Sequence, residues 1–378
     1  MVKIEDKNPH CSRKLKDLLH YRSLPEDLIM DIFLRLPVRS LLQLKCVCKS
    51  WKTLISDSQF AKRHLQRLTI NPSITNLQIF FGSELGRIAS LPLKPLLEKP
   101  SESTKAVEFS MEQYRFSILG ACNGLVCLLD THQGYVTLWN PSTRFKSKKS
   151  PSLNLLFNKW GVTCYGFGYD HVNDKYKVLL DVQFDDVRLY TFGENSWTTI
   201  QNFPCDPATP AGKFVRGTLN WVIVRWVDGY SEIQTTILSF DLVKEETYSE
   251  ILLPQNQKQN TCRCRNQIPQ LGVLDNCLCL SFDTETHLVV WLMKEYGIVE
   301  SWTKLMMIPA EHLSKHVEPQ LSVIEALFIC GNNIVLLRTS HKFFLYNLNN
   351  DMIDIPLIST SIRRSPHLYL ETLVSPRL

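Results

Sequence analysis

Hydrophobic positions follow two different periods along this chain. Between residues 24 and 68 they recur at intervals of one and three, as in Leu28, Ile32 and Leu36, with charged residues on the other side. Such a stripe is typical of amphipathic helices. After residue 71 they form short apolar runs bounded by Gly, Asn, Asp and Pro, which is typical of strands joined by turns. The pattern predicts a small helical head followed by an all-β body.

The head contains four predicted helices. Pro37 ends the first, the second runs through Ser40 to Leu44, and either Asp57 or Ser58 caps the fourth. The third helix has an apolar stripe of Val47, Trp51 and Ile55, which favours a packing role for Trp51. Because short helices enclose only a small core, we expect the head to bury its remaining apolar surface against a partner.

The body contains a repeat in which a strand ends in an aromatic residue followed by one more side chain. The aromatic residues are 50 to 55 positions apart, a period typical of kelch-like propellers built from four-stranded blades. They are Trp139, Tyr190, Phe240, Trp291 and Tyr346. Two further tryptophans, Trp197 and Trp302, each follow a turn and are predicted to pack between blades.

The ends of the body are expected to share one sheet. Five repeats are visible, an extra strand pair is predicted between residues 77 and 91, and a last strand lies at 368–373. Since an open edge would expose unpaired backbone groups, joining these segments closes a ring of about six blades. The predicted class is therefore α+β multidomain, with a disordered tail at 1–22, a helical domain at 23–70 and a propeller-like domain at 71–378.

Composition narrows the range of partners. The 378 residues are 44% hydrophobic and 21% charged, as in folded globular proteins, and the net charge of +5 does not by itself predict a nucleic-acid partner. No apolar stretch is long enough to predict a membrane span, and the first 22 residues do not resemble a signal peptide. Twelve cysteines scattered in apolar runs indicate reduced thiols, so we expect the protein in the cytoplasm or the nucleus.

Motifs for catalysis or cofactor binding are not found in the sequence. The pairs Cys262/Cys264 and Cys277/Cys279 are separated by a single residue, which is poor spacing for zinc, so we expect neither metal nor cofactor. A basic run, Arg144–Lys149, is one that phosphate or RNA could bind. Its position directly after a strand favours a solvated loop instead.

The head strongly resembles an F-box. The resemblance rests on Leu24-Pro25-Glu26-Asp27-Leu28, on Leu36-Pro37 and on Cys46-Val47-Cys48-Lys49-Ser50-Trp51. It implies docking on the Skp-type adaptor of a cullin-RING ubiquitin ligase. By motif position, the residues that would face the adaptor or shape the docking surface are Leu24, Pro25, Leu28, Ile32, Leu36, Pro37 and Leu41.

The body resembles the F-box-associated domain of plant F-box and kelch-repeat proteins. Six motifs account for this resemblance, and they cover most of the body. They are Cys122–Cys127, Trp139–Arg144, Tyr165–Asp170, Lys175–Val178, Gly217–Trp221 and Trp291–Gly297. The resemblance implies an interaction domain and does not transfer a particular target.

These observations favour a non-catalytic substrate receptor of an SCF-type ubiquitin ligase, which recruits a protein target for ubiquitination and proteasomal degradation. One alternative is a propeller scaffold that binds the adaptor without assembling an active ligase. Another is a propeller that binds sugars or performs oxidation, which the sequence does not suggest. Large aromatic residues away from the repeat positions and near loops are candidate target contacts, although each could instead be tucked under its own loop. They are Phe157, Trp160, Trp226 and Tyr230.

Overall fold

The structure is a computed structural model, and the chain divides into two compact units, residues 1–71 and 72–378. The residues it describes are 24–70, 73–82, 87–109, 116–153, 162–182, 187–201, 203, 207–227, 232–247, 250–254, 268–284, 286–315, 324–331, 333–339, 342–358 and 366–377. The predicted N-terminal tail lies outside the described residues.

The first unit is helical. Its helices are α2 (Glu26–Leu34), α3 (Val38–Leu44), α4 (Lys49–Ser56) and α5 (Ser58–Ile70). Pro37 occupies the N-cap of α3, and the backbone N–H of Phe60 donates to Asp57 Oδ1 at 2.9 Å, so Asp57 caps α5 as predicted. The third predicted helix starts later than expected, because Val47 lies in the turn before α4 and not on its apolar stripe.

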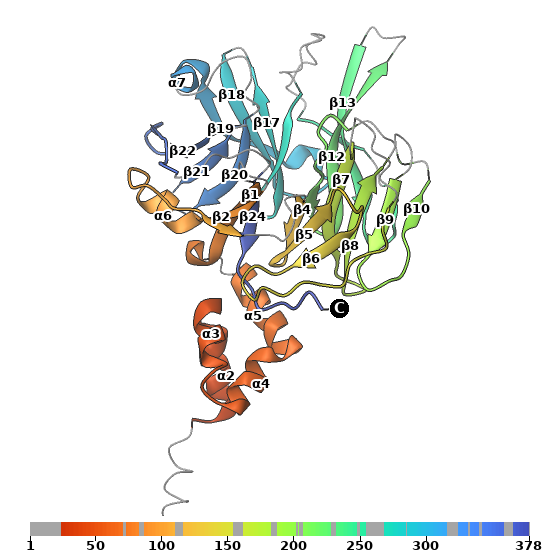
Figure 1. The fold of residues 1–378 in the computed structure, drawn as a ribbon. Helices are drawn as coiled ribbons and strands as arrows, with labels where there is room; N and C mark the ends of the chain where they lie inside the picture. Colours follow the sequence, from red (N-terminus) through yellow and green to blue (C-terminus); the bar gives the residue numbers. More distant parts are fainter. Residues whose placement is uncertain are drawn as a thin grey trace, which may run out of the picture. The chain divides into compact units, whose positions relative to one another are not determined.

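The second unit is a six-bladed β-propeller (Figure 1). Blades 1 to 3 contain β1 (Leu77–Gly82), β2 (Ile88–Pro92), β3 (Val107–Phe109), β4 (Phe116–Cys122), β5 (Leu125–Asp130), β6 (Val136–Trp139), β7 (Cys164–Asp170), β8 (Lys175–Asp181), β9 (Val187–Thr191) and β10 (Thr198–Ile200). Blade 1 has the strand order β24-β1-β2-β3, blade 2 is β4-β5-β6 and blade 3 is β7-β8-β9-β10.

Blades 4 to 6 complete the ring. They contain β11 (Lys213–Val215), β12 (Thr218–Val227), β13 (Glu232–Asp241), β14 (Glu246–Thr247), β15 (Ile251–Leu252), β16 (Gln270–Leu274), β17 (Cys277–Asp283), β18 (His287–Met293), β19 (Trp302–Pro309), β20 (Glu325–Cys330), β21 (Ile334–Arg338), β22 (Phe343–Asn347) and β23 (Ile353–Asp354). The last strand of the chain, β24 (His367–Leu370), belongs to blade 1. Short helices α6 (Leu93–Glu98) and α7 (Ala310–Ser314) follow β2 and β19.

The ring closes as predicted. β24, from the C-terminal end, pairs antiparallel with β1, from the start of the unit, through the register Leu77↔Leu370 to Phe80↔His367. β24 is thus the first strand of blade 1, while the other three strands of that blade come from residues 77–109. The edge of β1 is therefore paired and not open.

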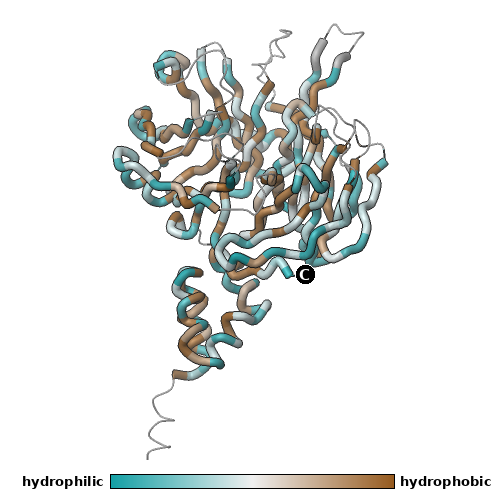
Figure 2. Tube along the Cα trace, viewed as in Figure 1, coloured by the Kyte–Doolittle hydropathy of each residue, from teal (hydrophilic) through white to brown (hydrophobic). Residues whose placement is uncertain are grey.

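Burial explains why the second strand of a blade lacks strict alternation of apolar and polar residues. Every residue of β5 is buried, and so are all residues of β8 except its first. Because each blade packs against a neighbour on both faces, both sides of its central strands are covered and strict alternation is lost. In Figure 2 hydrophobic residues gather along the strands, whereas the turns are mostly hydrophilic.

The five repeat aromatics occupy equivalent places, each in the third strand of blades 2 to 6. The two other tryptophans also behave alike, as predicted. Trp197 Nε1 donates to Pro151 O at 2.8 Å, and Trp302 Nε1 donates to Leu252 O at 3.2 Å. Each indole thus ties its blade to the chain of the preceding blade.

Candidate functional site

One side of α2 is apolar and uncovered. Leu24 is 55% exposed, Leu28 52% and Ile32 45%. Because they are four positions apart, the two helical residues Leu28 and Ile32 lie on the same side of the helix, with Leu24 preceding it. Aliphatic side chains gathered in this way on a small folded unit are typical of a protein-binding surface.

The opposite side of α2 faces the core of the helical unit. Phe33 is 4% exposed and its ring meets Trp51 edge to face at 5.1 Å between centroids, so Trp51 has the predicted packing role. His64 is fully buried, and its Nε2 lies 2.9 Å from the carbonyl oxygen of Leu36. α2 is therefore apolar on two sides, one for the core and one for a partner.

The other predicted docking residues differ in exposure. Pro25 and Pro37 are exposed and Leu36 is half-buried. Leu41 is fully buried, so it supports the docking surface from the core and offers no area to a partner. Val47, which the sequence places in the core, is 62% exposed, because the turn before α4 directs it away from the helix stripe.

The predicted target contacts on the propeller are placed only in part. Phe157, Trp160 and Tyr230 lie outside the described residues. Trp226 was expected in a loop, but its backbone belongs to β12, where it pairs with Ile233 of β13. The expectation of a loop is therefore wrong for Trp226. Strands β12 and β13 are ten residues long each, and Trp226 is still part of their pairing.

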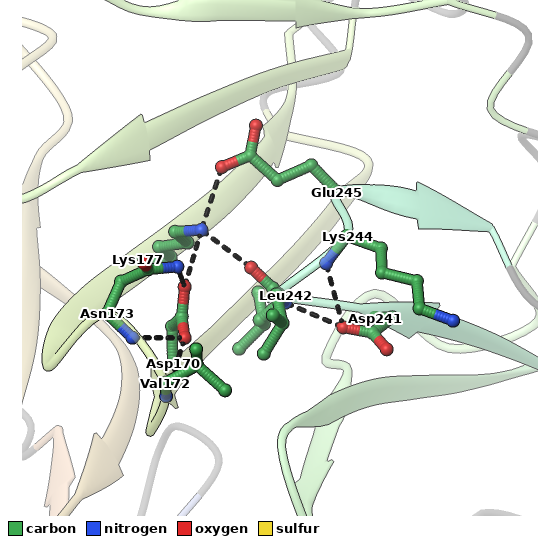
Figure 3. A network of polar contacts seen from close by, with 9 residues as sticks. Asp170, Val172, Asn173, Lys177, Asp241, Leu242, Lys244 and Glu245 are labelled. Atoms are coloured by element: carbon green, nitrogen blue, oxygen red, sulfur yellow. Dashed lines mark hydrogen bonds and ion pairs between the residues drawn. The ribbon is translucent and has the colours of Figure 1, made fainter.

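A buried lysine joins blades 3 and 4 (Figure 3). Lys177 Nζ lies 2.9 Å from Asp170 Oδ2 and 2.7 Å from Glu245 Oε1, and it donates to the carbonyl oxygen of Leu242 at 2.6 Å. Burial opposes the charge of Lys177, yet the hydrogen bonds to Glu245 and Asp170 outweigh it and raise its pKa. Burial also opposes ionisation of Asp170, but hydrogen bonds from Asn173 and Lys177 lower its pKa to about 2.

A tyrosine hydroxyl joins blades 4 and 5. Tyr296 donates to Asn220 Oδ1 at 2.8 Å and accepts from Thr218 Oγ1 at 2.8 Å, and it lies 2.6 Å from Ser239 Oγ. Tyr296 follows β18, whereas its three partners belong to β12 and β13. The hydroxyl therefore ties three polar side chains of blade 4 to blade 5.

The junction of blades 1 and 2 is held by the C-terminal segment. Asn140 Nδ2 donates to the carbonyl oxygens of Thr372 at 3.0 Å and Val374 at 2.7 Å, and the hydroxyl of Tyr369 donates to Asn140 Oδ1 at 3.2 Å. Gly124, with φ +73°, lets Thr372 approach, since a Cβ at that glycine would lie 2.1 Å from Thr372 Oγ1. The segment after β24 is thereby clamped against blade 2.

A second ion cluster lies among the inner strands. Glu325, at the start of β20, is buried between Lys213 of β11 and Arg338 of β21, which donates to Glu325 Oε2 at 2.9 Å and 2.6 Å. Burial opposes ionisation of Glu325, but the two cations outweigh it and lower its pKa to about 2. Both carboxylate oxygens are thus engaged in the scaffold.

No metal-binding arrangement occurs within the described part of the chain. Among those residues, no three His, Cys, Asp or Glu side chains are grouped so as to hold an ion. Cys277 and Cys279 both lie in β17, as predicted, and burial raises the pKa of the Cys279 thiol. Cys262 and Cys264 lie outside the described residues. The described helices include none that is long and apolar enough to cross a membrane.

Comparison with known proteins assigns both units. The F-box-like family model matches residues 21–67, and the model of the F-box associated beta propeller domain matches residues 82–358. The Arabidopsis thaliana F-box/kelch-repeat protein At3g23880 is 31% identical, over 96% of this chain and 98% of that protein. The chain belongs to the F-box proteins with an associated propeller. F-box protein CPR1 of the same plant is 30% identical over 76% of this chain and 73% of that protein.

In this F-box protein, the sequence motifs of the propeller mostly build the junctions between blades. Asn140, Lys177 and Tyr296 each belong to one of the six motifs, and each contacts a neighbouring blade or the C-terminal segment. Their side chains are occupied by these contacts. The family resemblance therefore accounts for the ring, and residues for any further role are more readily sought among side chains that the junctions do not use.

Proposed function

We propose that this F-box protein is the substrate-recognition subunit of an SCF-type ubiquitin ligase. The observation that supports adaptor binding is the uncovered face of α2, formed by Leu24, Leu28 and Ile32, in a unit that matches the F-box model. Through the Skp-type adaptor the chain would reach the cullin and RING subunits. The propeller would hold the protein target, which is then ubiquitinated and degraded.

The contribution of this chain is proximity. Holding a target close to the ubiquitin-loaded enzyme turns a bimolecular encounter into an effectively intramolecular one, with the covalent steps performed by other subunits. A closed ring suits this role, because its blade junctions are fixed by buried ion pairs and hydrogen bonds and it therefore presents its loops in a constant geometry.

The compartment we propose is the cytoplasm or the nucleus. All eight described cysteines are free thiols: four of them are exposed or partly buried, and the other four are buried in strands. Unpaired thiols of this kind suit a reducing compartment. Detection of the tagged full chain in cell fractions, together with the adaptor, tests this assignment.

The experiment that tests adaptor binding uses Leu28→Ala with Ile32→Ala in the full chain. Each truncation removes about 1–3 kcal/mol of apolar burial at an interface, so the pair weakens adaptor binding by about thirtyfold or more. Binding is measured by titrating purified Skp-type adaptor against the immobilised chain. The matched control is Ile70→Ala, because Ile70 is 76% exposed in the same unit but lies at the end of α5.

Wild-type adaptor affinity in the Leu28/Ile32 variant would contradict the assignment of this face, provided that circular dichroism shows intact helices. Recovery of cullin with the wild-type chain separates the two hypotheses for its role. A chain that captures adaptor but never recovers cullin is a scaffold or a competitor for adaptor, and is not a ligase subunit.

A further inference from the structure

A basic cavity lies on the propeller between blades 2 and 3. It has a volume of ≈ 650 Å³, which is within the range of small-ligand and peptide-side-chain pockets. The side chains that matter for its chemistry come from three stretches of chain that are distant in the sequence. They are Lys146, Lys148, Lys149, Tyr190, Glu194 and Arg377.

The basic stretch is fixed to the edge of blade 2 and is not a free loop. The backbone N–H groups of Ser147 and Ser150 donate to the carbonyl oxygens of Leu138 and Val136 at 2.8 Å and 3.0 Å. Ser150 Oγ also accepts from the N–H of Val136 at 2.9 Å. Residues 145–150 therefore cover the outer edge of β6, where blade 2 lacks a fourth strand. The segment is an exposed loop, as predicted, but its backbone is held against the sheet.

The other walls are fixed as well. Trp197 of blade 3 donates to Pro151 O, directly after the basic stretch, and Tyr190 OH donates to Glu194 O at 2.9 Å. The third wall is the C-terminal segment, which Asn140 clamps through Thr372 and Val374 and which runs past β6 in Figure 1. A cavity whose three walls are tied in this way is formed before any ligand arrives.

The cations of the cavity are not neutralised. Within the described part of the chain, no carboxylate lies at ion-pair distance from Lys146, Lys148, Lys149 or Arg377, and Glu194 is the one acidic residue among those that line the cavity. Three of these side chains rest on aromatic rings instead. Lys149 Nζ lies 4.2 Å from the ring centroid of Tyr135, Lys146 Nζ 5.7 Å from that of Phe116 and Arg377 Cζ 4.5 Å from that of Phe145.

Contacts with rings orient the charged groups of these side chains but use none of their N–H groups in an ion pair. Lys146, Lys148, Lys149 and Arg377 are all exposed to solvent. Four cations around one concave site, opposed by a single carboxylate, create a local positive field that the modest net charge of the chain does not reveal. Such a site favours a ligand with more than one negative charge.

We propose that this cavity binds a negatively charged segment of the target protein, with the charge supplied by neighbouring carboxylates or by a phosphoryl group. The proposal rests on the proposed function, since it takes the ligand to be a protein that the propeller recruits. The concave shape, confined to one junction of two blades, favours a short peptide segment over nucleic acid, which needs an extended track of cations along its phosphates.

The test uses the purified full chain and three synthetic peptide mixtures. All have a central position flanked by randomised uncharged residues, and the centre is phosphoserine, Glu-Glu or Ser. Equal amounts are applied to the immobilised chain, and mass spectrometry of the retained peptides gives the enrichment. We expect at least one charged mixture to be enriched about tenfold or more over the Ser mixture, and the enrichment to fall as salt is raised.

The variant that tests the location is Lys148→Glu with Lys149→Glu. Because the segment is held by backbone N–H groups, these exposed side chains can change without releasing it. We expect the enrichment to disappear. The matched control is Lys294→Glu with Lys315→Glu, which makes the same change in charge at exposed positions in and after blade 5 and should leave the enrichment unchanged.

Several results would overturn the proposal. These are equal retention of the charged and Ser mixtures, unchanged enrichment in the Lys148/Lys149 variant, and displacement of the peptides by single-stranded RNA or inositol hexakisphosphate at lower concentration than the peptides themselves. The relative retention of the phosphoserine and Glu-Glu mixtures identifies the source of the charge. Adaptor titration of the same variants keeps the two proposals apart, because loss of peptide binding with intact adaptor binding contradicts only this one.

Discussion

Replacing Lys177 with Met is expected to destabilise the propeller by about 3–5 kcal/mol. The lysine is 5% exposed, and its ammonium group is the cation that compensates Asp170, whose side chain is fully buried. Removing one partner of a buried ion pair leaves the other charge without compensation, and that cost is typically about 3–5 kcal/mol. Loss of the hydrogen bonds to Glu245 and to the carbonyl of Leu242 acts in the same direction.

The double variant Asp170→Asn with Lys177→Met is expected to recover most of this loss. Asparagine keeps an oxygen that can accept from the backbone N–H groups of Val172 and Asn173, as Asp170 Oδ1 does at 3.0 Å and 3.1 Å, but it brings no charge. A double-mutant cycle should then give a coupling of about 2–3 kcal/mol between the two side chains.

The assay is urea unfolding of the full chain, followed by tryptophan fluorescence. Lys175→Met is the matched control, because Lys175 starts the same strand but is partly exposed and should change stability by less than about 0.5 kcal/mol. Two results would refute the reasoning: a Lys177→Met chain as stable as the Lys175→Met control, or a double variant no more stable than Lys177→Met alone.

Three further predictions concern the ring. Deleting residues 368–378 should lower the unfolding temperature of the propeller markedly, since it removes most of β24 from β1; an unchanged midpoint would contradict closure. Tyr296→Phe should cost about 1–3 kcal/mol in urea unfolding, as three polar side chains lose their shared partner. Burial, and then Lys213 and Arg338, lower the pKa of His367 from 6.5 to about 3. Above pH 6.5 this histidine is neutral in the folded and the unfolded chain, but below pH 6.5 only the unfolded chain takes up the proton, so stability is lost as pH falls towards 3. Stability should drop by about 2 kcal/mol between pH 6.5 and pH 5, and His367→Gln should flatten this slope; equal slopes would reject the assignment.

The architecture was predictable because it follows from the spacing of hydrophobic residues along the chain and from the need to pair the edge strands of a sheet. The spacing of the repeat aromatics identified five repeats, and the structure places each aromatic in the third strand of a blade. The need to pair an open strand predicted that the strand pair between residues 77 and 91 joins the strand at 368–373, which the structure has as β1 and β24. The end of the first helix was also clear from Pro37. These features depend on local sequence or on a general rule for sheets, so a single chain suffices.

The sites were harder to predict, because they depend on which side of an element the fold covers. Leu28, Phe33 and Leu41 are all large apolar residues at helical spacing, yet Leu28 is half exposed while Phe33 and Leu41 are buried. Hydrophobicity alone does not distinguish a core contact from a partner contact. The basic cavity could not be predicted from the sequence for another reason. Arg377 and Lys148 line the same cavity only because β24 and the hydrogen bonds of Asn140 hold the C-terminal segment beside blade 2.

The closure of the ring also sets the order in which the protein can mature during synthesis. Strand β1 cannot pair with β24 until Leu370 has left the ribosome, whereas the last helix of the helical unit already ends at residue 70. A nascent or prematurely terminated chain would therefore possess a folded helical unit while its first blade still exposes the edge of β1. Under the proposed function, such a chain would occupy the adaptor while its propeller is still open at the edge of β1.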